Sequence, residues 1–394
     1  MSELPTASTP DDVLKLAQRQ TGLVDIDSDS WRPGLAILLD EINTSSAFTA
    51  HGREHLIGEY VKNLARRLQV HDYIQRHPEV LDTPVERPLF TLGMPRTGTT
   101  VISYLLSQDP ARRSLLHWEC IHPVPPATTK TLRTDPRCLA LLEEQQQILQ
   151  FVKDAKMPLP HWEDADGPTE CMFIHTQDFK GLSWDSYLST PRYAEWVINE
   201  ADMTSTYEYQ KRYLQVLQSG APGIWSLKMP SHSVHIDALL SVFPDARLIW
   251  AHRDPYKATG SLCNLWKLAK SIVMKPEMMN LAAMGRNATR QMQAHVERPL
   301  RVRDRIGDDR FFHMYYHEMM SDPMDVMRRI YDWAGDDLNP ETEARMNNWL
   351  AEHPQNLFAP NSYNLGQYGL AVEDLEPVFA EYLRTFDIAL EGKA

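Results

Sequence analysis

The sequence contains little cysteine and no long apolar run, and each shortage excludes a class of protein. Its four cysteines lie far apart without a CxxC pair, which argues against a disulfide framework and a zinc site and predicts free thiols. The longest aliphatic run, Leu35 to Leu39, is far shorter than the roughly 20 residues that cross a bilayer. The first residues lack the basic and apolar pattern of a signal peptide. We therefore expect a cytoplasmic protein without a transmembrane segment.

The chain is also poor in positive charge. Its 40 lysines and arginines face 53 aspartates and glutamates, for a formal net charge of −13. This balance disfavours a protein whose main partner is a nucleic-acid backbone. A small anion would need only a local cluster of arginines and backbone amides. Hydrophobic residues make up 43% of the chain, which is enough to bury a core.

The pattern along the chain predicts one large α/β domain with helical additions. We expect an N-terminal helical segment over residues 1–85 and a main domain over 86–394, with a helical, acceptor-binding insertion at about 121–219. Short apolar runs followed by helical patterns predict a P-loop-like central parallel sheet flanked by helices. The runs that we expect to form strands are 87–93, 224–228, 246–251 and 310–316.

The segment GMPRTGTT, residues 93–100, has the layout of a phosphate-binding loop at the entry to a helix. Its glycines let backbone amides curl around an anion, and the helix N-terminus adds partial positive charge. The ordinary loop carries a lysine where Thr99 stands, and that lysine clamps a nucleoside triphosphate. The cation of this loop is Arg96 instead. Taken alone, the segment is equally well a strand-to-helix turn without a ligand.

This loop resembles the 5′-phosphosulfate-binding loop of the sulfotransferase family, in which a lysine or arginine precedes S/T-G-T-T. Arg96 is similar to the arginine of the tyrosylprotein and bacterial branches. The resemblance implies that the donor is 3′-phosphoadenosine-5′-phosphosulfate (PAPS), that the product is 3′-phosphoadenosine-5′-phosphate (PAP), and that no metal is needed. It also implies that the 5′ end of the donor contacts four further loop residues, Thr97, Gly98, Thr99 and Thr100.

A second segment, RDPYKATGS from Arg253 to Ser261, follows the expected strand at 246–251. It resembles the 3′-phosphate motif of the same family, which implies that Arg253 and Ser261 hold the 3′-phosphate. An arginine here could equally form a surface ion pair with Asp254. The stretch that begins at Tyr316 (YHEMMSDP) resembles the family's segment near the adenine, and it could also be plain core.

Catalysis needs cations around the leaving oxygen and a base for the acceptor. Arg96 and Lys228, the latter at the end of an expected strand, are the candidates for the leaving oxygen. Glu119 is similar in position to the glutamate base of the tyrosylprotein sulfotransferases, so the resemblance implies that role. His122 and Glu170 remain alternative bases, and each of these side chains could instead serve as a cap or an ion-pair partner.

The sequence therefore predicts a PAPS-dependent sulfotransferase that acts on a hydroxyl or amine of a small, apolar or aromatic acceptor. The alternatives are a P-loop kinase or NTPase, and a PAP-binding protein that has lost catalysis. Thr99 in place of lysine speaks against the kinase. A homodimer is expected on general grounds alone.

Overall fold

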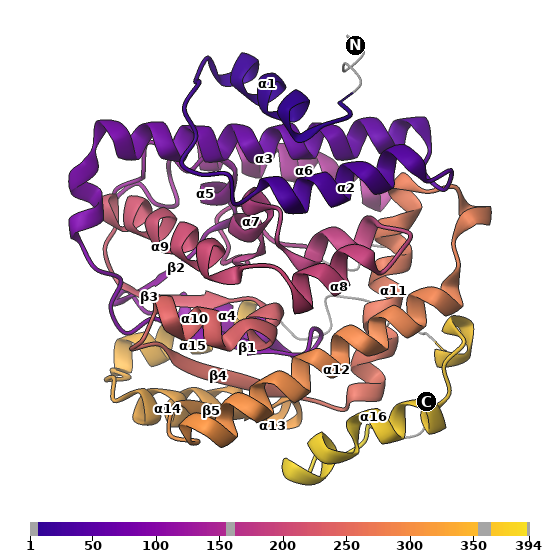
Figure 1. The fold of residues 1–394 in the computed structure, drawn as a ribbon. Helices are drawn as coiled ribbons and strands as arrows, with labels where there is room; N and C mark the ends of the chain where they lie inside the picture. The colour runs from indigo at the N-terminus through magenta and orange to yellow at the C-terminus, as the bar shows by residue number, and fades with distance from the viewer. Residues whose placement is uncertain (1–6, 155–161, 354–363, 392–394) are drawn as a thin grey trace.

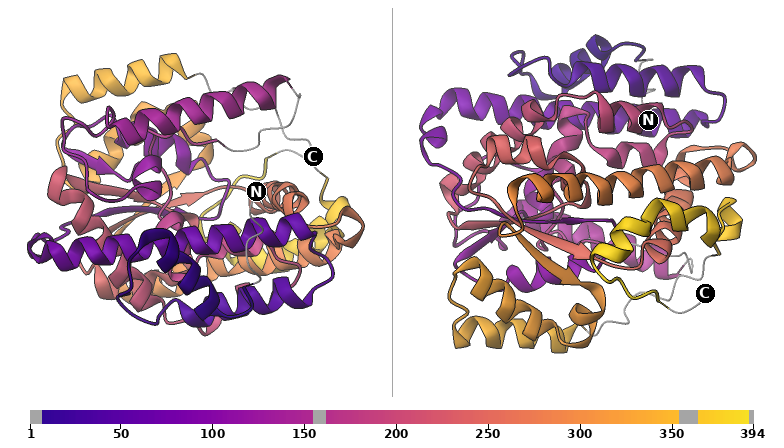
Figure 2. Two further views of the ribbon diagram at one scale, coloured as in Figure 1. Left: turned by 90° about the horizontal axis from the view of Figure 1, so that it is seen from above. Right: turned by 60° about the horizontal axis from the view of Figure 1, so that its bottom comes forward.

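The structure, a computed structural model, describes residues 7–154, 162–353 and 364–391. Within them, strands form one parallel sheet of order β2-β3-β1-β4-β5, with helices on both faces (Figures 1 and 2). The strands are β1 (Leu89–Gly93), β2 (Arg112–Ser114), β3 (Ile224–Lys228), β4 (Arg247–His252) and β5 (Phe311–Tyr315). The predicted fold class, a central parallel sheet flanked by helices, is confirmed.

Helices supply the remaining layers of the molecule. The first group is α1 (Pro10–Thr21), α2 (Arg32–Thr44), α3 (Ala50–Arg76), α4 (Thr99–Leu106), α5 (His117–Ile121), α6 (Pro136–Asp154), α7 (Met172–His175), α8 (Arg192–Asn199) and α9 (Met203–Gly220). The second group is α10 (Ile236–Val242), α11 (Pro255–Val273), α12 (Leu281–Ile306), α13 (Tyr316–Ser321), α14 (Pro323–Ala334), α15 (Pro340–Glu352) and α16 (Val372–Thr385). The 3₁₀ turns are η1 (Pro78–Asp82), η2 (Thr176–Asp178), η3 (Leu182–Tyr187), η4 (Pro230–His235), η5 (Pro276–Met278) and η6 (Leu365–Tyr368).

Strand β4 explains why the sheet is covered on both faces. Leu248 and Trp250 pack into a core shared with α10 and α12, whereas Ile249 and Ala251 pack into a second core with α4, α14 and α15. Successive side chains of a strand point to opposite faces, so a run of four apolar residues needs cover on each side. The carboxyl ends of the parallel strands are left as the edge where loops can build a site.

The N-terminal helices are joined to the insertion by a buried arginine. Arg67 of α3 pairs with Asp27 at 2.6 Å and with Asp178 at 2.7 Å, and its side chain is fully buried. The predicted boundary at residue 85 stays a prediction. All four cysteines are buried free thiols. In the part of the chain that the structure describes, no helix combines the length and apolar character needed to cross a bilayer.

Candidate functional site

The loop from Gly93 to Thr100 curls at three positions with positive φ. Gly93 has a φ of +133°, Arg96 of +69° and Gly98 of +82°. A Cβ on Gly93 would lie 2.5 Å from the carbonyl oxygen of Ala251, so only glycine fits against the neighbouring strand. Thr97 donates its hydroxyl to the carbonyl of Met94 at 2.8 Å and so stiffens the loop from within. The amides that open α4 follow directly, as an anion cradle requires.

The second motif is held at the end of β4 by a helix cap. Asp254 accepts hydrogen bonds from the amides of Tyr256 and Lys257, and Pro255 occupies the first turn of α11. This cap ends the strand at His252 and leaves Arg253 at the carboxyl edge of the sheet.

The structure brings the two motifs together. Nη1 of Arg253 donates to the carbonyl oxygen of Arg96 at 2.7 Å, and Nε of Arg96 donates to Oγ of Ser261 at 3.0 Å. The Arg253 guanidinium also lies 3.8 Å above the ring of Tyr316. Tyr316 is the first residue of α13, just beyond β5, and its ring would meet a Cβ placed on Gly98 at 3.0 Å.

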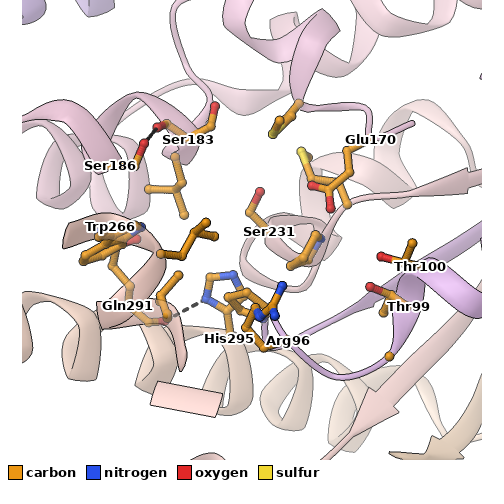
Figure 3. Close-up of a pocket in the computed structure, with 18 of the residues that line it drawn as sticks. Arg96, Thr99, Thr100, Glu170, Ser183, Ser186, Ser231, Trp266, Gln291 and His295 are labelled. Carbon is orange, nitrogen blue, oxygen red and sulfur yellow. Dashed lines mark hydrogen bonds between the residues drawn. The ribbon is translucent and has the colours of Figure 1, made fainter. Parts of the chain in front are cut away.

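A cavity of about 480 Å³ opens beside both motifs. Arg96, Thr99 and Thr100 line one side of it, and Ser183, Ser186 and Trp266 line the other (Figure 3). Arg253, Gly98 and Tyr316 also line it, together with apolar side chains that include Leu182, Tyr187 and Leu265. The cavity therefore combines the cationic loop on one side with a mixed lining on the other, in which serines stand among apolar side chains.

A carboxylate forms an ion pair with Arg253, the arginine of the second motif. Glu391, beyond α16, accepts from Nε of Arg253 at 2.5 Å and from Nη2 at 2.8 Å, and its own amide donates to Asp254 at 2.8 Å. Two parallel hydrogen bonds to one guanidinium are the geometry in which arginine also binds a phosphate. The Arg253 site is thus built to take an anion.

Lys228 lies behind the cavity wall. Its Nζ is 2.8 Å from Oε1 of Glu170, which lines the cavity, and 3.6 Å from Oε1 of Glu163. The Lys228 side chain is only 2% exposed. Burial alone lowers the pKa of this ammonium, but the two carboxylates outweigh burial and hold the pKa above its usual value. Lys228 is therefore a buried cation that approaches the cavity through Glu170.

Of the three predicted bases, only Glu170 lines this cavity. Glu119 is 1% exposed, and its carboxylate pairs with Arg113 and accepts from the amide of Leu116. His122 lies at a separate groove beside Arg137. The pKa of His122 is lowered, mainly by burial and also by the positive charge of Arg137. The geometry therefore favours Glu170, the alternative that the sequence left open, over Glu119.

Two residues at the site were not singled out from the sequence. Glu163 lies in an irregular stretch before Glu170, and Glu391 is near the C-terminus. Neither belongs to a motif with a recognisable spacing. The cations that bring them to the site, Lys228 and Arg253, are distant along the chain, so no local signal could have identified their place there.

The fold and the site define an α/β protein with two candidate anion-binding motifs at the carboxyl edge of a parallel sheet. Residues 88–340, more than half of the chain, match the family model described as "Sulfotransferase family". The chain belongs to the sulfotransferase family.

Solved structures and a curated relative agree with this membership. The sulfotransferase STF9 of Mycobacterium avium is 72% identical, with a TM-score of 0.95 and 100% of both chains covered. STF1 of Mycobacterium tuberculosis is 27% identical, with a TM-score of 0.82, 95% of this chain and 98% of that chain covered. The omega-hydroxy-beta-dihydromenaquinone-9 sulfotransferase Stf3 of Mycobacterium bovis is 25% identical over 303 residues, which are 73% of this chain and 72% of that protein.

Proposed function

We propose that this protein transfers a sulfuryl group from PAPS to a hydroxyl or amine of a small apolar acceptor. The observation that carries the proposal is the contact between the two anion motifs: Arg253 donates to the Arg96 carbonyl, and both residues line one cavity. A nucleotide with phosphate at both 3′ and 5′ positions needs two such sites within its own span. A triphosphate needs the lysine that Thr99 replaces.

Each end of the donor has residues suited to hold it. The amides at Gly98, Thr99 and Thr100 would bind the 5′ end, and Arg253 with Ser261 would bind the 3′-phosphate. Tyr316, packed under the Arg253 guanidinium, is suited to border the adenosine. The anion cradle fits because Gly98 leaves space that a side chain would close.

Glu170 is proposed as the base of an in-line displacement. The acceptor O–H bond breaks and its proton passes to Glu170, while the acceptor oxygen forms a bond to sulfur. The bond between sulfur and the bridging oxygen breaks, and its electron pair leaves with PAP. Arg96 is suited to stabilise the charge that grows on this oxygen, and Lys228 supports Glu170 from behind.

The apolar side chains that line the cavity support an apolar acceptor. Leu182, Tyr187 and Trp266 line it, and two of these come from the predicted insertion at 121–219. One relative is named as a sulfotransferase of a menaquinone derivative, and an apolar acceptor of that kind agrees with the apolar side chains of this cavity. We propose that the insertion contributes to acceptor binding. A cytoplasmic location and a homodimer stay predictions.

Ligand-induced thermal stabilisation tests the donor. PAP without metal is expected to raise the unfolding temperature, because a ligand that binds only the folded state stabilises it. Stabilisation by ATP with magnesium and none by PAP would indicate a kinase. Saturable PAP binding without transfer of labelled sulfate from PAPS to any apolar alcohol or amine would indicate a binding protein.

A matched pair of variants tests the base. Glu170→Gln is expected to lower kcat by about 10² to 10⁴, the usual contribution of a positioned base, with PAP affinity unchanged. Glu119→Gln is expected to lower thermal stability, because it leaves Arg113 buried with a weaker partner, yet to keep its turnover per folded molecule. Wild-type turnover in Glu170→Gln would remove the assignment.

A further inference from the structure

Three charged side chains, Glu170, Lys228 and Glu163, form a connected row beside the cavity. Glu170 is at the cavity wall with 17% of its side chain exposed, Lys228 is next, and Glu163 follows with 5% exposed. One buried ammonium therefore stands between two carboxylates. Only Glu170 has a role in the reaction proposed above, and Lys228 supports it, which leaves the second carboxylate, Glu163, to be explained.

Glu163 is held in place by neighbours that leave one oxygen directed at Lys228. Gln145 of α6 donates to the Glu163 carbonyl at 3.0 Å and accepts from the amide of Ala165 at 2.7 Å. Thr169 donates its hydroxyl to Oε2 of Glu163. Oε1 is the oxygen that lies 3.6 Å from Nζ of Lys228. Such local anchoring of backbone and side chain is typical of a residue whose position matters.

We propose that Glu163 is a positioning residue that shares Lys228 with Glu170, so that Lys228 keeps a counter-ion when Glu170 takes the acceptor proton. This inference rests on the proposed function, in which Glu170 is the base. Glu163 touches neither substrate, and it acts through Lys228.

The physical reason lies in the change of charge at Glu170. In the proposed reaction, both carboxylates of the row are ionised before transfer and Lys228 is positively charged. After Glu170 takes the proton from the acceptor oxygen, it is neutral and no longer balances Lys228. A buried ammonium without a counter-ion is strongly destabilised, so protonation of Glu170 would be opposed. Glu163 keeps its charge throughout and removes that opposition.

The same charge also affects how readily Glu170 accepts a proton in the proposed reaction. If Glu163 were neutral, Lys228 would be balanced by Glu170 alone. The ammonium would then interact with Glu170 alone and favour its ionised form more strongly. Glu163 draws part of the ammonium's interaction away from Glu170, which makes Glu170 a better proton acceptor.

Other titratable groups face this row from the elements packed against it. Ring Nδ1 of His117 lies 3.9 Å from Oε2 of Glu163. Burial raises the pKa of the Cys120 thiol, of the Cys171 thiol to about 12, and of the Tyr104 hydroxyl, so these three stay neutral near pH 7. His117 is therefore the neighbour whose charge needs a control variant.

The test is the pH dependence of kcat for Glu163→Gln at saturating PAPS. The acidic limb of the profile is expected to move to lower pH by about one unit, the lower end of the pKa shifts that a neighbouring charge causes. The plateau of kcat is expected to fall roughly tenfold, part of the 10² to 10⁴ that a positioned base contributes. KM for PAPS and PAP affinity should not change. Glu163→Asp, which keeps the charge, should hold the limb near its wild-type position, and so should His117→Gln.

A second comparison covers the case in which Glu163→Gln does not fold. In Lys228→Gln the acidic limb should lie at higher pH than in the wild type. Adding Glu163→Gln to that variant should move the limb to lower pH, because a nearby negative charge has been removed. An unmoved limb in both comparisons, or equal shifts in Glu163→Asp and Glu163→Gln, would overturn the positioning role. Absence of sulfuryl transfer in the wild-type enzyme would instead overturn the proposed function.

Discussion

The pairing of Arg253 with Glu391 predicts that one substitution near the C-terminus, far from the loop in sequence, strengthens donor binding. If Arg253 holds the 3′-phosphate, the nucleotide must first displace the carboxylate that now makes two hydrogen bonds to it. Glu391→Gln removes the competing charge and keeps the shape of the side chain. PAP should therefore bind more tightly to the variant than to the wild type.

The size of the effect follows from the exposure of the pair. The two side chains are 18% and 35% exposed, so the pair is partly solvated. Ion pairs of this kind contribute about 0.2 to 1 kcal/mol, and the two-point geometry favours the upper end. Since about 1.4 kcal/mol is a factor of ten, the Kd for PAP should fall by up to about fivefold.

Isothermal titration of PAP and of 5′-AMP separates this cause from others. AMP lacks the 3′-phosphate, so its affinity should be the same in both proteins. Glu381→Gln removes the same charge from an exposed position of α16 and serves as the matched control, with unchanged PAP affinity. Equal or weaker PAP binding in Glu391→Gln, or an equal gain for AMP, would refute the reasoning.

Three further predictions concern the loop and the chemistry. Arg96→Met should lower kcat by about 10² to 10³, as for loss of one preorganised donor, and a wild-type kcat would remove Arg96 from catalysis. Gly98→Ala should lose PAP affinity and about 1 to 2 kcal/mol of stability, because alanine is strained at a φ of +82° and meets the Tyr316 ring; calorimetry and denaturant unfolding check both. Turnover should persist in EDTA, and a loss restored by magnesium would contradict the metal-free mechanism.

Much of the fold was predictable because it is encoded in short segments. The run at 224–228 forms β3 with the predicted bounds, and 246–251 forms β4 displaced by one residue, as Arg247–His252. The run at 87–93 forms β1 from Leu89. Buried parallel strands are continuous apolar runs that end in loops, so contiguous residues report them.

The carboxylate proposed as the base was less predictable than the two candidate anion motifs. Glu119, inferred by resemblance, pairs with Arg113 only six residues away, and the sequence contained no sign that this partner would bury it. Lys228 was predicted as a cation for the leaving oxygen, but it lies behind Glu170 and does not line the cavity. Whether a side chain reaches the cavity or lies behind its wall depends on tertiary packing, and no local sequence pattern specifies that packing.

The sequence by itself determined the elements proposed to bind anions: a strand, a glycine turn and a helix at Gly93 to Thr100, and an arginine before a capped helix at Arg253. These depend on backbone conformation and capping, which neighbouring residues control. Only the tertiary structure decided that Glu170 faces the cavity, that Glu163 backs Lys228 and that Glu391 covers Arg253. The partners of Lys228 and Arg253 lie 58 and 138 residues away, and only chain packing brings such charges within hydrogen-bond distance.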